Sequence, residues 1–337
     1  MSRAFRKSRP SFLLKEEPSI EALLRPTSWN DYIGQEKIKS NLRLIIEAAK
    51  KRNETCDHLL LYGQAGLGKT TLANLIAKEL GGQLKVATGP AIEKTSDLAA
   101  VLSTLERGDI LFIDEAHRIN RAVEELLYPA METYQLHLVI GKGPSARMIN
   151  LDLPPFTLIA ATTRLNLLSA PLRSRFGAVF QIDYYSLEDI KKIIQRSAKI
   201  LKVEILEEAV EVIAKASRFT PRIANRLLKR VRDLAQVKRA ERISQEIALE
   251  ALSLFEIDEW GLEEPDRRLL RVIKERFNGG PVGISSLAAA LGEDKGIIED
   301  VYEPYLIKLG FLQRTPSGRI ITDLAKRHLE NYHHKRD

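Results

Sequence analysis

The segment HLLLYGQAGLGKTTLANLIAKELGG, residues 58–82, most limits what this chain can fold into. An apolar run at residues 59–62 is followed by three glycines, then by Lys69 and Thr70 at the start of a helical apolar pattern. The segment satisfies G-x-x-x-x-G-K-[ST], in which backbone N–H groups surround phosphate oxygens, the lysine meets the β- and γ-phosphates, and the hydroxyl reaches Mg²⁺. Because a strand pattern precedes the loop and a helix pattern follows it, a chance glycine turn is the weaker interpretation. We expect a triphosphate site here.

A second segment, DILFIDEAH, places two carboxylates at the end of an apolar strand pattern. Asp114 at the strand end is suited to hold the shell of a magnesium ion, and Glu115 to orient and deprotonate an attacking water. The letters DEAH also mark a class of two-lobed RNA helicases. Such a helicase needs a second α/β lobe with a Q-R-x-G-R sequence, and the chain after Phe180 shows neither.

A third strand pattern occurs in FTLIAATTRLNLLSAPLRSRFG, residues 156–177. It ends in Thr162 and Thr163, where a hydroxyl or the backbone could contact the γ-phosphate or the water. Arg173 and Arg175 follow closely. An arginine at this point can reach a nucleotide held by a neighbouring subunit, and such a residue typically contributes 10³–10⁵ in rate. The alternative, a surface salt bridge, is less favoured in the setting LRSRF.

Together these segments resemble the RuvB family of AAA+ motors, which drive branch migration of Holliday junctions in bacteria. The resemblance extends from about Leu23 to Leu329 and rests on long, family-restricted stretches. These include LLRPTSWNDYIGQEKIK, VEELLYPAME, IGKGPSAR, TPRIANRLLKRVRD and IEDVYEPYLIKLGFLQRTPSGR. It implies an α/β fold: an AAA+ P-loop ATPase core with a parallel sheet, a helical lid and a C-terminal winged helix.

The residue pattern supports the same three parts. We expect a large ATPase domain at 1–183, with 1–19 as a disordered tail, and a small helical lid at 184–256, where apolar residues recur every three or four positions. Residues 257–337 are predicted to form a winged-helix, DNA-binding domain, because three helix patterns are followed by a hairpin pattern, FLQRTPSGRIIT.

The resemblance implies ATP and Mg²⁺ as cofactors and assigns the nucleotide contacts residue by residue. Matches to the family's adenine, phosphate and lid contacts are Leu24, Arg25, Tyr32, Ile33, Gly66, Lys69, Thr70, Thr71, Tyr185 and Arg222. Thr70 and Asp114 match the magnesium contacts, and Asp114 and Glu115 match the Walker B pair.

Further matches concern the γ-phosphate and the neighbouring subunit. Thr162 matches the family's sensor near the γ-phosphate, with Thr163 as the alternative, and Arg175 matches the arginine finger. A segment described as close to nucleotide in the family matches residues whose own chemistry does not explain that role: Glu132, Thr133 and Tyr134.

Two hairpins are candidate interaction sites. Arg314 and Arg319 flank the tip TPSG of the predicted wing, where both could meet DNA phosphates without reading sequence. The alternative interpretation is that these two arginines at a turn serve only the solubility of the protein. Residues 134–156 alternate apolar and polar positions, with large apolar side chains at Val139, Ile149 and Leu151. These could pack back on the core, but the resemblance favours docking to RuvA, the junction-binding partner.

The chain departs from the family's usual pattern at four places. Gln64-Ala65 replaces two prolines, which makes the phosphate loop less stiff. Ala116 replaces an isoleucine behind the carboxylates, and Thr133 replaces an acid. Phe219 stands where a glycine usually precedes TPR, which affects the approach of Arg222.

The predicted function is an ATP-driven hexameric ring that moves duplex DNA through Holliday junctions in recombination and repair, with RuvA and the RuvC resolvase. A clamp-loader-type ATPase and a non-enzymatic winged-helix DNA binder are the alternatives; the first would not need the wing, and the complete motifs argue against the second. One cysteine, Cys56, and the absence of a long apolar run predict a cytoplasmic protein without a membrane span. The net charge of +7 suits polyanionic partners.

Overall fold

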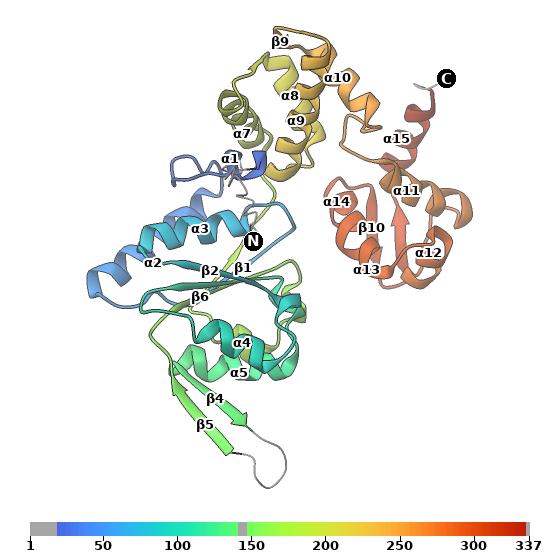
Figure 1. The fold of residues 1–337 in the computed structure, drawn as a ribbon. Coiled ribbons are helices and arrows are strands. Elements are labelled where there is room, and N and C mark those ends of the chain that lie inside the picture. The colour runs from blue at the N-terminus through green and yellow to red at the C-terminus, as the bar shows by residue number, and fades with distance from the viewer. Residues whose placement is uncertain (1–18, 141–146, 335–337) are drawn as a thin grey trace, which may run out of the picture.

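The computed structural model describes residues 19–140 and 147–334. A parallel sheet covered by helices is followed by a helical bundle and then by a small domain of helices and one hairpin (Figure 1). No helix in these ranges is long and apolar enough to cross a bilayer. The expected tail at 1–19 lies, except for Ser19, outside the described residues.

The large domain is built on a five-stranded parallel sheet in the order β2-β3-β6-β1-β7. Its strands are β1 (Leu59–Tyr62), β2 (Leu84–Thr88), β3 (Ile110–Asp114), β6 (Thr157–Thr162) and β7 (Ala178–Gln181). β1, β3 and β6 are short apolar runs because helices cover both of their faces. The carboxyl ends of β1, β3 and β6 lie side by side, which is where ligands bind in such sheets.

Helices form a layer on each face of this sheet (Figure 1). One face carries α2 (Glu36–Arg52) and α3 (Lys69–Leu80), and the other carries α4 (Thr95–Leu102) and α5 (Arg121–Glu132). The strands supply both cores by alternation: Leu59 and Leu61 pack on the α2/α3 side and Leu60 on the α4/α5 side. The face a strand residue occupies therefore decides which core or site it can join.

Shorter elements complete the large domain. They are α1 (Ile20–Leu24), the 3₁₀ turns Gly89–Ala91, Ala116–Arg118 (η2) and Leu165–Leu167, and α6 (Ala170–Arg173). A hairpin of β4 (Gln135–Ile140) and β5 (Arg147–Asp152) follows α5 and precedes β6 in the chain, and it projects away from the domain (Figure 1). All six residues of β5 are exposed, so this strand does not pack back on the core.

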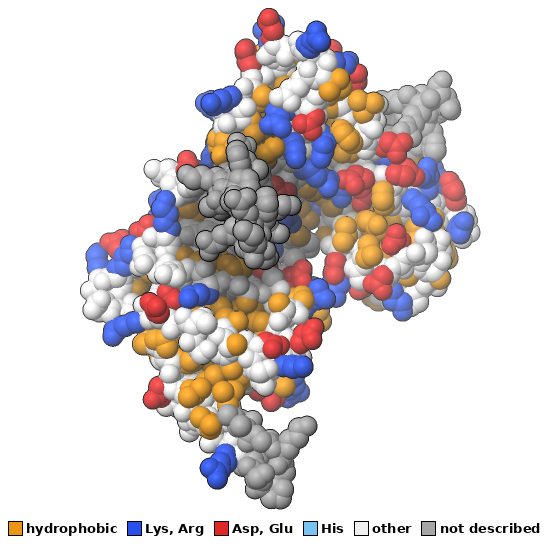
Figure 2. All heavy atoms as spheres, in the orientation of Figure 1, with side chains coloured by type: hydrophobic (Ala, Val, Ile, Leu, Met, Phe, Trp, Pro, Cys, Tyr) orange, Lys and Arg blue, Asp and Glu red, His pale blue; other side chains and the backbone are white. Residues whose placement is uncertain are grey.

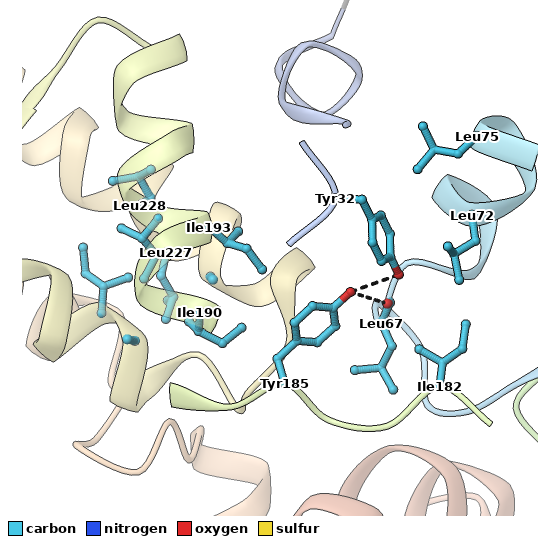
Figure 3. Close-up of a cluster of buried hydrophobic side chains, with 14 of the residues drawn as sticks. Tyr32, Leu67, Leu72, Leu75, Ile182, Tyr185, Ile190, Ile193, Leu227 and Leu228 are labelled. Atoms are coloured by element: carbon cyan, nitrogen blue, oxygen red, sulfur yellow. Dashed lines mark hydrogen bonds between the residues drawn. The ribbon is translucent and has the colours of Figure 1, made fainter. Parts of the chain in front are cut away.

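The lid is a bundle of four helices with a short two-stranded parallel sheet. Its elements are α7 (Leu187–Ile200), β8 (Glu204–Ile205), α8 (Glu207–Ala216), α9 (Pro221–Val237), β9 (Arg242–Ile243) and α10 (Gln245–Leu254). The lid shares one hydrophobic core with the α2/α3 face of the sheet. Figure 3 shows Ile190 and Leu227 of the lid on one side and Leu72 of α3 on the other, with Tyr185 between them.

The C-terminal domain has a hydrophobic core of its own, centred on Phe311 and Leu269. Its elements are α11 (Glu264–Arg276), α12 (Ile284–Leu291), α13 (Lys295–Ile297), the π-helical turn η5 (Ile298–Tyr302), α14 (Glu303–Lys308), β10 (Leu312–Thr315), β11 (Gly318–Ile321) and α15 (Asp323–His334). Helices followed by an antiparallel hairpin give the winged-helix arrangement expected from the sequence. Acidic and basic side chains lie side by side where this domain faces the lid (Figure 2).

The interior strand β3 provides a test of the sheet. Phe112→Ala should lower the free energy of unfolding by about 3–5 kcal/mol, because Phe112 is fully buried and its removal leaves a cavity. Val86→Ala is the matched control, since Val86 pairs with Phe112 across the β2–β3 ladder but is 60% exposed. Its cost should stay below about 1 kcal/mol. Urea unfolding followed by circular dichroism measures both, and equal costs would contradict the observed burial.

Candidate functional site

The phosphate loop curls because three of its glycines adopt left-handed backbone conformations. At Gly63 the backbone φ is +148°, and a Cβ would lie 2.2 Å from the carbonyl oxygen of Ile182. The loop ends at the first turn of α3, which contains Lys69, Thr70 and Thr71. The Lys69 ammonium donates to the carbonyl oxygens of Gly63 (2.7 Å) and Gln64 (2.9 Å). The loop therefore encloses its own cation at the amino end of a helix, an arrangement that suits anionic phosphate.

The charge on Lys69 is costly where it lies. Burial lowers the pKa of Lys69 to about 8, while nearby Asp114 acts to raise the pKa and Arg222 to lower it. The two carbonyl oxygens leave the ammonium without an anionic hydrogen-bond partner. A phosphate oxygen would supply one.

The carboxylate pair at the end of β3 meets the start of α3. The hydroxyl of Thr70 lies 3.4 Å from Asp114 Oδ2, and the Glu115 N–H donates to Asp114 Oδ1 (2.9 Å). One carboxylate and one hydroxyl fit Mg²⁺ that arrives with a triphosphate, because Mg²⁺ retains waters and takes few protein ligands. Glu115 is exposed, has φ of +50°, and pairs with Arg118 at 3.2 Å.

Of the two threonines that end the β6 segment, the geometry favours Thr163 as the phosphate sensor. Thr162 is buried on the α4/α5 side; its hydroxyl lies 3.0 Å from His117 Nδ1 and accepts a hydrogen bond from the Arg164 N–H (2.9 Å). Thr163 follows the end of β6; if the alternation of the strand continues by one residue, its side chain lies on the face of Phe112. Thr162 thus supports this segment from behind, which favours its alternative, Thr163, for the predicted contact with phosphate.

Tyr32 and Tyr185 lie against the phosphate loop (Figure 3). The Tyr185 hydroxyl lies 3.0 Å from the Tyr32 hydroxyl and 3.2 Å from the carbonyl oxygen of Leu67. Burial raises the pKa of Tyr185 to about 12, so it stays a neutral donor. Leu24 is buried nearby, and its carbonyl oxygen accepts from Arg196 of the lid.

Two other predicted adenine contacts sit at the edge of this region. Ile33 is half-buried against the shared core, and Arg25 is exposed after the end of α1. The segment from Leu24 to Ile33 therefore runs beside the lid and the phosphate loop, as a nucleoside-contacting segment must.

The lid reaches the loop through the start of α9. A Cβ on Gly66 would lie 2.8 Å from Thr220 Cγ2 and 3.0 Å from the Cβ of Arg222. Phe219, with φ of +51°, accepts the Tyr185 N–H at its carbonyl oxygen and packs its ring against the winged-helix core. The phenylalanine at 219 thus attaches this segment to the next domain, three residues before Arg222, which lies against the loop.

Arg175 belongs to a different face of the sheet. Its Nη1 donates to the carbonyl oxygen of Pro171 (2.6 Å), and its guanidinium lies over the ring of Tyr128 at 4.3 Å. Its Nε lies 3.1 Å from Glu132 Oε1, an ion pair without hydrogen-bond geometry. The structure thus brings Arg175 together with Glu132 at the end of α5 and not with Lys69 of the same chain.

The residues that follow Glu132 turn into the hairpin. Thr133 is exposed and bonds back to Pro129, and Tyr134 has φ of +53° and packs edge-on to Phe156. Ile149 and Leu151 of the hairpin are exposed by 39% and 42%. The backbone of Val139 pairs with Met148, and the side chain of Val139 lies outside the described residues.

The two wing arginines are not equivalent. Arg314 and Arg319 face each other across β10–β11, and both donate to Glu299 Oε1, at 2.5 and 2.9 Å. The Arg314 side chain is 53% exposed, but that of Arg319 is 8% exposed and also bonds Glu303 at 2.6 Å. The exposure of Arg314 is compatible with the expected phosphate contact, whereas the buried Glu303 and the half-buried Glu299 hold Arg319 inside the domain.

The large domain and the lid form an AAA+-type P-loop ATPase, here joined to a winged-helix domain. The features that define this class are the phosphate loop, the carboxylate pair at the end of β3, the lid arginine at the loop and a separate arginine finger candidate. Three family models cover most of the chain: the Holliday junction DNA helicase RuvB P-loop domain at 24–182, the RuvB AAA lid domain at 185–258 and the RuvB C-terminal winged helix domain at 259–330. The chain belongs to the RuvB family of Holliday junction DNA helicases.

Solved structures agree with this assignment. The Thermotoga maritima RuvB Holliday junction branch migration motor matches with 51% identity and a TM-score of 0.85, over 91% of this chain and 98% of that one. Two mutants of the same Thermotoga protein match with the same values. The lid and winged-helix boundaries expected from the sequence, at 184 and 257, lie close to the starts of the matched regions.

Sequence reasoning missed several residues around the site. His117 ends the quoted segment DILFIDEAH and Arg118 follows it, but their partners, Thr162 and Glu115, become visible only in the fold. Arg164 pairs with Asp300, which is 136 residues away, so no local spacing could have signalled it.

The lowered pKa of Lys69 predicts a pH-dependent affinity for ATP. Phosphate should return the pKa toward its ordinary value of 10.5, so ATP binding should take up protons above pH 8 and weaken as pH rises through this range. Calorimetric titration in buffers of different ionisation enthalpy measures the uptake. Lys69→Arg is the control, because a guanidinium stays charged and the uptake should vanish. Binding without proton uptake in the unaltered chain would contradict the lowered pKa.

Proposed function

We propose that this Holliday junction helicase hydrolyses ATP in pockets shared by two protomers of a hexameric ring. The observation that carries this proposal is the position of Arg175. Lys69 begins α3 on one face of the sheet, whereas Arg175 packs on α5 of the other face, beside Glu132. A pocket that needs both cations would take Arg175 from a neighbouring copy.

Within one protomer, the loop residues hold the triphosphate. The N–H groups around Gly66 and the start of α3, at Thr70 and Thr71, surround the phosphates, and Lys69 exchanges its two carbonyl partners for phosphate oxygens. Thr70 and Asp114 would hold Mg²⁺, which would neutralise charge between the β- and γ-phosphates.

The attacking water is assigned to Glu115 and Thr163. Glu115 must leave Arg118 and turn toward the phosphate side, and its exposure permits this movement. Thr163 presents the sensor hydroxyl from the face of Asp114, while Thr162 and His117 hold its segment from behind.

The base and the lid lie on the other side of the phosphate loop. Leu24, Arg25 and Ile33 would border the adenine, and Tyr32 and Tyr185 support the loop beneath it. Arg222 would contact the phosphates from the lid and so make the lid angle depend on the nucleotide.

The neighbouring protomer would complete the pocket. Arg175 stabilises charge that develops on the γ-phosphate, a contribution of typically 10³–10⁵ in rate. Glu132, Thr133 and Tyr134 would accompany it, because Glu132 orients Arg175 in the free protomer. A segment remote from Lys69 of the same chain would in this way border the nucleotide of the neighbouring protomer.

Two surfaces are assigned to the partners. Arg314 would contact duplex DNA phosphates along the junction arms. The hairpin, through Val139, Ile149 and Leu151, would bind RuvA; the exposure of Ile149 and Leu151 supports a protein contact, and Figure 2 shows hydrophobic side chains gathered near the hairpin base. We place RuvC in the same assembly and the protein in the cytoplasm, where Cys56 stays a thiol.

Mixed rings test the shared pocket. Lys69→Met and Arg175→Ala should each lower ATP turnover by about 10³-fold or more when alone. In an equal mixture, roughly one pocket in four joins an intact loop to an intact finger, so turnover should return to a sizeable fraction of the unaltered rate. Turnover and junction branch migration are measured together. A mixture as inactive as its parents, with full turnover in a dilute unaltered monomer, would contradict the proposal.

The wing is tested by its two arginines. Arg314→Gln should weaken binding to linear duplex DNA and reduce the salt-dependence slope by about one, because one phosphate contact is lost. Arg319→Gln should instead lower the melting temperature, since it leaves Glu303 buried without its cation. Fluorescence anisotropy across a salt series measures the first effect and thermal unfolding the second. An unchanged slope in Arg314→Gln would exclude that contact.

A further inference from the structure

Glu299 and Asp300 are consecutive residues of η5, and each is held by a different functional region. Asp300 receives the Arg164 guanidinium at two points: Nε donates to Oδ1 at 2.5 Å, and Nη2 pairs with Oδ2. Glu299 Oε1 accepts from Arg314 and Arg319 of the wing. One turn of backbone thus joins the sensor loop of the ATPase domain to the DNA-binding hairpin.

On the ATPase side, Arg164 is tied to the catalytic strand ends. Its N–H donates to the Thr162 hydroxyl, which lies 3.0 Å from Nδ1 of His117. His117 is two residues after Glu115, within η2, which packs on β6. A shift of Arg164 therefore acts on the hydrogen bonds directly behind Asp114 and Glu115.

Two ion pairs that join the winged-helix domain to the rest of the chain differ in burial. Arg218 of the lid bonds Asp266 at 2.6 Å, with side chains 11% and 1% exposed, and its Nε bonds the carbonyl oxygen of Gly261. The Arg164–Asp300 side chains are 29% and 41% exposed. Breaking a buried pair leaves an uncompensated charge, whereas water can replace either partner of an exposed one. Of these two contacts, Arg218–Asp266 is therefore the fixed joint, and Arg164–Asp300 can open.

DNA can reach the other end of this connection. Arg314 is 53% exposed while it shares Glu299 Oε1 with Arg319. A phosphate that captures Arg314 removes one of the two cations on Glu299, in a π-helical turn, a rare geometry that is frequent at functional sites. The adjacent Asp300 lies in the same turn.

We propose that Arg164 and Asp300 form a releasable latch through which DNA on the wing adjusts the ATP site. When Arg314 moves from Glu299 to a phosphate, η5 rearranges, the Arg164–Asp300 pair weakens, and the sensor loop is freed to adopt the hydrolysing arrangement. Arg164 and Asp300 are positioning residues in this scheme. The inference rests on the proposed DNA contact of Arg314, which the salt-slope experiment above tests separately.

The test compares ATP turnover of the full chain with and without linear duplex DNA. Asp300→Asn should open the latch without DNA, so turnover in its absence rises and the DNA-dependent increase falls by about 2- to 10-fold, while DNA affinity stays unchanged. The charge-reversed pair, Arg164→Asp with Asp300→Arg, should restore the DNA-dependent increase that Arg164→Asp alone loses. Glu330→Gln is the matched control, because it removes another exposed ion pair of the same domain, with Lys274, outside this connection.

The result distinguishes a latch from a merely structural contact. If Asp300→Asn retains the normal DNA-dependent increase, or if both turnover values fall in proportion and the reversed pair restores neither, the latch does not exist. The absence of any DNA-dependent increase in the unaltered chain would overturn the inference as well, without affecting the shared-pocket proposal. The latch is supported if the charge-reversed pair restores the DNA-dependent increase in turnover that Arg164→Asp loses, while Glu330→Gln keeps the normal increase.

Discussion

The buried ammonium of Lys69 is the interaction on which the rest of the site depends. It lies inside a loop that only left-handed glycines can form, and its two hydrogen bonds go to neutral carbonyl oxygens of that loop. This keeps a cation in place at a cost that an incoming phosphate removes. The surrounding residues then have defined tasks, because the strand ends that present Asp114 and the lid that presents Arg222 both converge on this charge.

Around that charge, the chain uses the two faces of the sheet for different purposes. The α2/α3 face carries the loop and continues into the lid, so nucleotide binding and lid position share one packed core. The α4/α5 face carries Arg175, Glu132 and the hairpin, which are the parts proposed to meet other molecules. Thr162 and His117 lie on this second face, where the hydrogen bond between them supports the segment that follows β6.

Local signals were enough to predict the strand–loop–helix of the phosphate site, the carboxylates at the end of β3, the helical lid and the hairpin tip at residues 315–318. They depend on residues adjacent in sequence. The sequence predicts Thr162 as the sensor with Thr163 as the alternative and cannot weigh the face that each residue occupies, because strand parity has meaning only once it is known which helices cover which face. The burial of Arg319 and the pairing of Arg164 with Asp300 depend on contacts between distant segments, which periodicity cannot reveal.

The core shared by the lid and the sheet has a mechanical consequence. Interdigitated side chains such as Tyr185, Ile190 and Leu72 cannot slide smoothly, because intermediate positions would open voids that close packing does not tolerate. The lid should therefore move between a few discrete, well-packed positions relative to the sheet and not rotate continuously. Binding and release of a nucleotide would then move the lid in discrete steps.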